Sequence, residues 1–322
     1  GYVDKEKAEA IRDAAREVAA GRYMDQFPLD VFQTGSGTSS NMNVNEVVAN
    51  LANQKLGGEV GAYEHVNPND HVNFGQSSND TIPSALQLGG VDLLRNELIP
   101  KLASLIDAWD AKAKQYESVV KTGRTHLQDA LPITFGHVFR GYVGVLERVK
   151  ESLEEAAGLL CEIPLGGTAV GTGFQGPEGL AERAAELLSS ALDEDIRIAA
   201  APLVHMAGRP AVTDVMGRVA TLAAELQRIA NDVRMMGSGP RLGLGELQLP
   251  SLQPGSSIMP GKVNPVVCES VVQVGLAVAG HHATALAAAA GGQFELNVTF
   301  PVTAYALLES TQILANTCEV FR

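Results

Sequence analysis

Residues 212 to 236 read VTDVMGRVATLAAELQRIANDVRMM, the most regular apolar pattern in the chain. The apolar positions recur in alternating steps of three and four. They are Val212, Val215, Val219, Leu222, Leu226, Ile229, Val233 and Met236. This spacing is an a/d seam, the pattern of a long helix that packs against other helices. The stretch therefore predicts one long helix of a bundle.

Other parts of the chain show helical patterns of similar or shorter length. We expect helices at 5–20, 43–55, 81–119, 134–161, 180–192 and 265–290, and from 301 to the end. Pro100 should kink the third of these helices. Alternating strand patterns are few and no internal repeat is present. Long helices with apolar seams, joined by polar loops, predict an all-α helix bundle.

The segment from Ser270 to Phe294 contains no Lys, Arg, Asp or Glu. A membrane span needs about 20 predominantly apolar residues. This run is interrupted by polar side chains and is rich in Ala and Gly rather than Leu, Ile and Phe, so we interpret it as a helix of a soluble protein. It predicts a helix buried on every side, either within the bundle or between subunits.

Composition excludes several classes of protein. The 322 residues carry a net charge of −13, which repels nucleic acid and anionic membranes. Cys161, Cys268 and Cys318 form neither a disulfide framework nor a zinc motif, which favours a reducing compartment. The first four residues do not begin a signal peptide. We therefore expect a cytoplasmic protein without nucleic-acid or membrane partners.

Residues 254 to 265 read PGSSIMPGKVNP and end a long Gly/Pro-rich loop that begins near residue 237. Asn264 suits the N-cap of the following helix and Pro265 suits its first position. Free backbone N–H groups and the helix dipole would then lie beside Lys262, which makes an anion site. An ordinary loop with a surface lysine explains the same residues equally well.

A glycine-rich segment, residues 166 to 173, reads GGTAVGTG. Such a pattern invites comparison with dinucleotide-binding loops. No strand pattern precedes it and no βαβ pattern surrounds it, so we reject that interpretation.

Four polar segments separate the long helices, at 34–41, 67–80, 121–129 and 254–265. Loops at one end of a bundle can converge although they are far apart in sequence. Together they supply Ser, Thr, Asn, His and Lys but neither a metal-ligand cluster nor a nucleophile elbow. This set suits the binding of carboxylates and offers a histidine for proton transfer.

These segments resemble the fumarase/aspartase superfamily. Residues 255–265, GSSIMPGKVNP, resemble its signature loop, and TGSGTSSNMNVNE at 34–46 resembles the class II fumarases. QSSND at 76–80 and GRTHLQD at 123–129 are also fumarase-like, because aspartases usually have Ser-Thr-Asn-Asp and a Gln in place of His126. GSGPR at 237–241 and FELN at 294–297 fit as well, so the resemblance spans the chain.

The resemblance implies reversible hydration of fumarate to L-malate, a reaction of the tricarboxylic acid cycle. The resemblance makes Ser256 the base. It pairs His126 with Glu269 to act on the water or the leaving hydroxyl. Lys262 and Asn264 would bind the substrate carboxylate. The rest of the implied cradle is Ser36, Thr38, Ser77, Ser78, Asn79 and Thr125. No cofactor and no metal are implied. The implied assembly is a homotetramer whose sites draw on three subunits.

A second dicarboxylate site is implied at Asn67, Asn69 and Asp70. Asn67 is the aspartase-like choice there, and Glu64 and Phe74 replace the basic residues usual in fumarases. Asn67 therefore keeps aspartate ammonia-lyase or a related dicarboxylate lyase open as an alternative. A non-catalytic helical scaffold of the same fold is a further alternative. We expect a partial N-terminal helical domain at 1–76 and a central bundle domain at 77–322. We also expect the family's small C-terminal domain to be absent.

Overall fold

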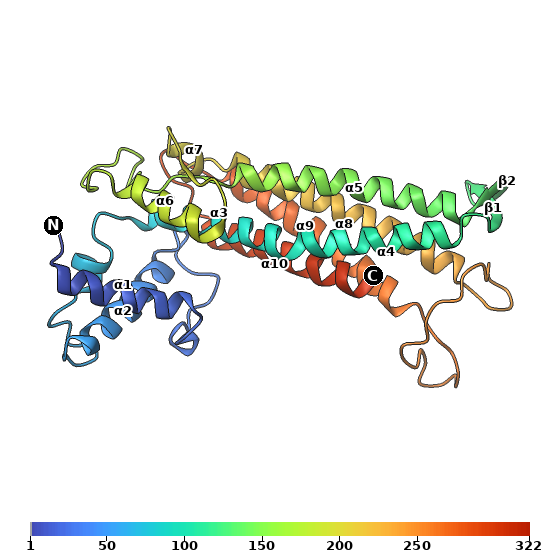
Figure 1. Ribbon diagram of the computed structural model, residues 1–322, viewed down its shortest axis with the longest axis horizontal. Coiled ribbons are helices and arrows are strands. Elements are labelled where there is room, and N and C mark those ends of the chain that lie inside the picture. Colours follow the sequence, from blue (N-terminus) through green and yellow to red (C-terminus); the bar gives the residue numbers. More distant parts are fainter. Residues whose placement is uncertain (1) are drawn as a thin grey trace. The chain divides into compact units, whose positions relative to one another are not determined.

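The computed structural model describes residues 2–322 and is mostly helical, which confirms the all-α prediction (Figure 1). The main helices are α1 (Lys5–Ala19), α2 (Thr38–Lys55), α3 (Ser78–Leu93), α4 (Ile99–Gln115), α5 (Phe135–Leu159), α6 (Leu180–Leu192), α7 (Leu203–Met206), α8 (Pro210–Met236), α9 (Val266–Ala290) and α10 (Phe300–Phe321). The strands are β1 (Val120–Thr125), β2 (Gln128–Thr134), β3 (Glu162–Ile163) and β4 (Arg197–Ile198).

The chain forms two compact units, which are described separately. The first unit comprises residues 1–88, 161–210 and 286–305, and the second comprises 89–160, 211–285 and 306–322. The second unit holds most of the long helices, and the first holds α1, α2, α6 and α7.

The predicted seam forms the core of the second unit. All eight seam residues of α8 are buried, and none is more than 7% exposed. An aromatic cluster joins three further helices, because Trp109 of α4 contacts Phe139 and Tyr142 of α5 and Phe321 of α10. Burying apolar and aromatic surface of this kind is the main source of stability in a helix bundle. The bundle prediction is confirmed.

The helical pattern predicted from 81 to 119 contains an irregular turn before Pro100. The helices α3 and α4 are joined by a π-helical turn, Leu94–Leu98, and Pro100 lies in the first turn of α4. Proline has no backbone N–H and its ring collides with the carbonyl four residues earlier. A widened turn relieves that collision, so the expected disturbance takes the form of a π-turn.

Small residues bring α1 and α2 together in the first unit. Their shared core contains Ala10, Ala14, Val48, Ala49 and Ala52. Asn53 at the end of α2 is fully buried and bonds four backbone groups. Its amide donates to the carbonyls of residues 49 and 66, and its oxygen accepts from the N–H groups of residues 65 and 66. This residue pins the following loop to the helix.

Two local predictions are wrong. The second helix begins at Thr38 rather than near Asn43, because Gly37 adopts a left-handed φ of 70° and starts the helix there. Residues 120–134 form the hairpin of β1 and β2 where only a polar break was expected. The hairpin includes a bulge between Thr122 and Arg124, so its side chains do not alternate regularly.

The apolar helix α9 has the expected bounds but not the expected burial within one chain. It is long and apolar enough to cross a membrane, and only 28% of its most apolar window is buried. Leu276 is 62% exposed and Leu286 is 48% exposed. Burial on every side within the chain is therefore contradicted, and burial between subunits stays a prediction.

Candidate active site

Ser256 lies in a tight turn of the loop between α8 and α9. Its hydroxyl oxygen accepts hydrogen bonds from the backbone N–H groups of Ile258 (3.2 Å) and Met259 (3.1 Å). These donors come from residues that follow Ser256 in the turn, and not from its neighbours Gly255 and Ser257. Two donors aimed at one oxygen stabilise negative charge on it, as an oxyanion hole does.

The two ends of this loop are tied together. The Gly255 N–H donates to the Lys262 carbonyl and the Asn264 side chain donates to the Gly255 carbonyl, both at 2.8 Å. Asn264 therefore closes the loop and is not the expected N-cap, and α9 begins at Val266. A Cβ at Gly255 would come within 2.8 Å of backbone atoms of Lys262 and Asn264, so only glycine fits. This closure holds Ser256 and Lys262 on one compact loop.

His126 occupies the tip of the β1–β2 hairpin. His126 and Leu127 form its two-residue connection, with φ angles of 55° and 62°. Such turns require positive φ at both positions and favour Asn and Gly. Strained backbone of this kind concentrates at functional sites. The turn presents Thr125 and His126 on the wall of a cavity of about 840 Å³.

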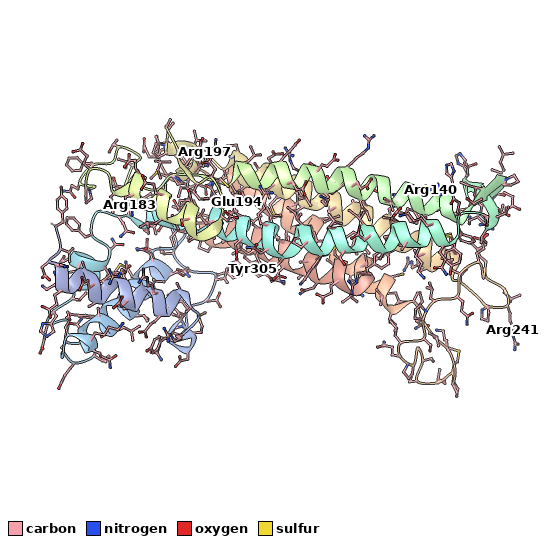
Figure 2. All side chains as sticks on the ribbon, viewed as in Figure 1. Arg140, Arg183, Glu194, Arg197, Arg241 and Tyr305 are labelled. Carbon is pink, nitrogen blue, oxygen red and sulfur yellow. The ribbon has the colours of Figure 1, made fainter. Side chains whose placement is uncertain are left out.

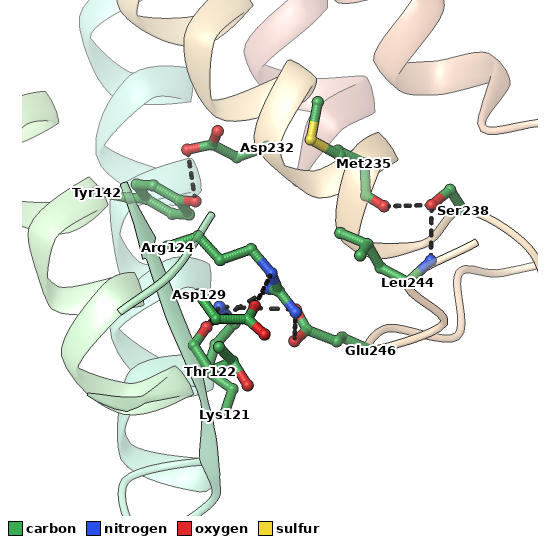
Figure 3. Close-up of polar contacts among 10 residues, drawn as sticks. All are labelled: Lys121, Thr122, Arg124, Asp129, Tyr142, Asp232, Met235, Ser238, Leu244 and Glu246. Carbon is green, nitrogen blue, oxygen red and sulfur yellow. Dashed lines mark hydrogen bonds and ion pairs between the residues drawn. The ribbon is translucent and has the colours of Figure 1, made fainter. Parts of the chain in front are cut away.

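An ion network fastens this hairpin to the loop that leads to Ser256 (Figure 3). Arg124 Nη2 lies 2.9 Å from Glu246, and Lys121 Nζ lies 3.6 Å from it. Burial raises the pKa of Glu246, but the hydrogen bond and charge of Arg124 and the charge of Lys121 outweigh it, so the pKa is lowered. Glu246 therefore stays ionised. Arg241, in the same loop, projects outward from it (Figure 2).

The predicted pairing of His126 with Glu269 is not formed in the single chain. Between residues 2 and 322, no hydrogen bond or ion pair joins these two side chains. Glu269 lies in the first turn of α9 and is half-buried. His126 is exposed. The pairing stays a prediction for the assembled protein.

Hydroxyl groups are linked in a chain in the first unit. Ser36 Oγ lies 2.7 Å from Thr38 Oγ1, which lies 2.8 Å from Ser78 Oγ. Thr38 starts α2 and Ser78 starts α3, so two helix N-termini meet at these hydroxyls. Hydroxyl donors beside helix N-termini suit a bound carboxylate. The structure thus brings together three of the predicted cradle residues.

Ser77 and Asp80 form a capping box at the start of α3. Ser77 Oγ accepts from the Asn79 N–H at 3.2 Å, and the Asp80 carboxylate accepts from the Ser77 N–H at 3.1 Å. Asn79 Nδ2 donates to the Ala169 carbonyl at 2.8 Å. The four residues 77–80 are therefore fixed by local bonds and by a contact with the glycine-rich segment.

The predicted second site forms one short turn. The Asn67 side-chain oxygen accepts from the N–H groups of Asn69 (2.8 Å) and Asp70 (3.0 Å). Its oxygen thus caps the turn, while Asn69 and Asp70 are exposed. The three residues therefore lie together, and the side-chain oxygen of Asn67 is already engaged in capping the turn.

The glycine-rich segment corrects one premise of the sequence analysis. A two-residue strand, β3, does precede it and pairs in parallel with β4. The helix between them, α6, begins at Leu180, well after the segment ends. The N–H groups of Gly166 (3.0 Å) and Thr168 (2.8 Å) both donate to Asp80. These two donors are therefore directed at a side chain of the protein.

Sequence reasoning missed Glu246 and Asp80. Asp80 was detectable, because Ser77 and Asp80 have the spacing of a capping box. Glu246 carried no comparable signal, since its partners Lys121 and Arg124 lie far earlier in the chain.

Comparisons with known proteins agree with the fold and with these motifs. The family model described as "Lyase" matches residues 1–280. The class II fumarate hydratase of Corynebacterium efficiens is 48% identical over all 322 residues, which span 67% of its length. That of Neisseria meningitidis is 47% identical over 321 residues, 100% of this chain and 70% of its own.

Solved structures give the same result. The class II fumarase of Schistosoma mansoni has a TM-score of 0.94 and 39% identity, covering 100% of this chain and 70% of that one. A fumarate lyase:delta crystallin structure from Brucella melitensis has a TM-score of 0.93 and 42% identity, covering 98% and 68%. The family match and the length of the alignments show that the chain belongs to this lyase family, in which its close relatives include the class II fumarate hydratases.

Proposed function

We propose that this chain hydrates fumarate to L-malate and catalyses the reverse reaction, with Ser256 as the base. The chain is a class II fumarate hydratase, a lyase, by its identity of 46–48% to curated enzymes of that name. The geometric observation that carries the mechanism is the pair of backbone N–H groups on Ser256 Oγ. A serine hydroxyl is a poor base unless its alkoxide is stabilised.

In the direction of elimination, the Ser256 alkoxide removes the proton from the carbon next to one carboxylate of malate. The electron pair moves into that carboxylate, which becomes an aci-carboxylate dianion. In this proposal Lys262 and Asn264, which lie on the same closed loop, bind the carboxylate that gains this charge. The C–O bond then breaks, the double bond of fumarate forms, and the hydroxyl leaves.

His126 transfers a proton to the departing hydroxyl or from the attacking water. Its place at the cavity wall and at the tip of a strained turn supports this role. Glu269, contributed through the assembly, would fix the tautomer of His126. Thr125 on the same hairpin would donate to the substrate.

The unreacting carboxylate is held by Ser36, Thr38, Ser77, Ser78 and Asn79. Their hydroxyl chain and capping geometry support this assignment. The exposed turn of Asn67, Asn69 and Asp70 is the proposed second dicarboxylate site.

The proposed assembly is a homotetramer whose active sites draw on three subunits. The exposed apolar surface of α9 supports it, because large exposed apolar patches mark interfaces. An α9 covered in this way belongs to a soluble protein, and the cytoplasm is its proposed compartment.

The test of this function is Ser256→Ala, compared with the unchanged protein. Without the base, kcat for malate should fall by about a thousandfold or more, while a dicarboxylate inhibitor such as succinate still binds. Ser257→Ala on the same loop is the matched control and should keep its turnover. Near-normal turnover by Ser256→Ala would contradict the assignment.

A further inference from the structure

Asp80 is a buried carboxylate for which the proposed chemistry has no direct use. It is 0% exposed, and its pKa is raised by burial although four donors oppose that shift. Oδ1 accepts from the Ser77 N–H (3.1 Å) and Thr81 Oγ1 (3.2 Å), and Oδ2 accepts from Gly166 and Thr168. Among the residues that the structure describes, no ion pair to Asp80 is found. A buried charge of this kind is costly unless hydrogen bonds satisfy it.

The glycine-rich segment is shaped around this carboxylate. Gly166 has a φ of 90° and Thr168 a φ of 57°, which turns their N–H groups toward the same oxygen. Backbone N–H groups that converge in this way resemble a nest that binds anions, although the Gly167 N–H between them donates to the Pro164 carbonyl. A Cβ at Gly166 would lie 2.5 Å from Cβ of Ala181, so the segment has no room to shift toward α6. Here the nest holds an internal carboxylate.

The contact between Asp80 and the glycine-rich segment adjoins the residues proposed to bind the unreacting carboxylate. Asp80 directly follows Ser77, Ser78 and Asn79, and Asn79 bonds the carbonyl of Ala169. Ser78 in turn bonds Thr38. The turn at 77–80 therefore lies between the glycine-rich segment on one side and the hydroxyl chain on the other.

We propose that residues 166–169 and Asp80 form a clamp that sets the 77–79 turn for binding the unreacting carboxylate of the substrate. Asp80 is a positioning residue in this proposal and does not touch substrate. The inference rests on the proposed function, because it concerns the same cradle. The unreacting carboxylate has the same charge in the ground state and the transition state, so the clamp contributes to both equally.

The experiment compares Asp80→Asn and Gly166→Ala with two controls in the full chain. Asp80→Asn keeps the size of the side chain, but it directs an amide N–H group at backbone donors. We expect KM for fumarate and the dissociation constant of succinate to rise together by about tenfold or more, with kcat within about twofold. Gly166→Ala displaces the same contact from the other side without changing charge, and should give the same pattern.

The controls separate positioning from stability. Asn53→Ala removes a buried residue that also bonds four backbone groups, and it should lower the melting temperature without changing KM. Gly179→Ala adds the same left-handed strain, with a φ of 76°, where no atom lies within 4 Å of the new Cβ. It should leave succinate binding unchanged.

Four outcomes distinguish the clamp from its alternatives. A parallel rise of KM and the succinate constant in both clamp variants supports the clamp. Unchanged succinate binding in a folded Asp80→Asn or Gly166→Ala protein overturns it, as does an equal rise in Asn53→Ala. If the unchanged chain binds succinate but does not turn over fumarate, the proposed function fails, and the succinate constants of the variants still support or overturn the clamp.

Discussion

His126 combines a proposed chemical role with an unfavourable backbone conformation. Non-glycine residues at positive φ cost about 1–3 kcal/mol at such strained positions, and asparagine tolerates them best. The proposed proton transfer would account for a histidine at the tip of this turn, whereas the turn conformation itself favours asparagine or glycine. The folded protein is thus less stable with histidine at this position than it would be with a residue that favours the turn.

His126→Asn should therefore separate stability from activity. We expect the melting temperature to rise, by the equivalent of about 0.5–1 kcal/mol, while kcat falls by about a hundredfold or more. Leu127→Asn is the matched control, because it relieves the same kind of strain and should keep its activity. Thermal melts and malate turnover measure both effects. A fully active His126→Asn protein would exclude the histidine from catalysis.

Single residues also show where sequence reasoning ended. The fumarase-like motifs identified Ser256, Lys262 and Asn264, but the donors to Ser256 proved to be Ile258 and Met259. Asn264 has the composition of an N-cap and instead closes the loop. Which backbone group a short polar side chain meets depends on the path of the loop, and the path is not encoded in local propensity.

At the scale of elements, Glu246 joins the β1–β2 hairpin to the loop that carries Ser256, the proposed base. Glu246→Gln removes the charge that Arg124 and Lys121 share, which should lower the free energy of unfolding by about 1–3 kcal/mol. The loss of kcat should be larger than the change in KM, because the hairpin carries His126. Glu225→Gln, a surface partner of Arg228, is the control and should have little effect.

The pH dependence of stability gives an independent check on this network. The pKa of Glu246 is lowered in the folded protein, so its contribution is complete above the ordinary pKa of glutamate. That contribution is lost as the pH falls through the lowered folded value. The stability difference between the unchanged protein and Glu246→Gln should therefore shrink in acid. A difference that stays constant down to the lowest pH measured would contradict the ion network.

Elements with strong periodicity were predictable and short ones were not. The bounds of α6, α8 and α9 follow from apolar spacing and end signals, and all eight seam residues of α8 are buried as expected. The first turns of α2 were missed because Thr, Ser and Asn favour caps and loops. The β1–β2 hairpin was missed because its strands are short and bulged, so they lack a regular alternation.

For the whole molecule, the exposed face of α9 predicts dependence on assembly. Leu276→Arg places a charge on that face and should yield smaller, helical and inactive species. Leu276→Met keeps the surface apolar and is the control. Light scattering after size exclusion gives the mass, circular dichroism gives the helicity, and malate turnover gives the activity. A monomeric Leu276→Arg protein with normal turnover would show that one chain holds a complete site.

Assembly is also the level that one sequence reveals least. The apolar run of α9 indicated burial, yet only 28% of its most apolar window is buried within the single chain. The predicted pairing of His126 with Glu269 belongs to the same level, since a contact between side chains of different subunits would leave no sign in the spacing of one chain.

The most direct test of the central claim is the absorbance of fumarate as it forms from L-malate and, separately, from L-aspartate. The water-specific assignment of His126 and the 77–80 turn predicts fumarate from malate and none from aspartate. Fumarate released from aspartate would make the chain an ammonia-lyase and contradict the account. A folded tetramer that reacts with neither substrate would contradict it as well, and would favour a non-catalytic scaffold.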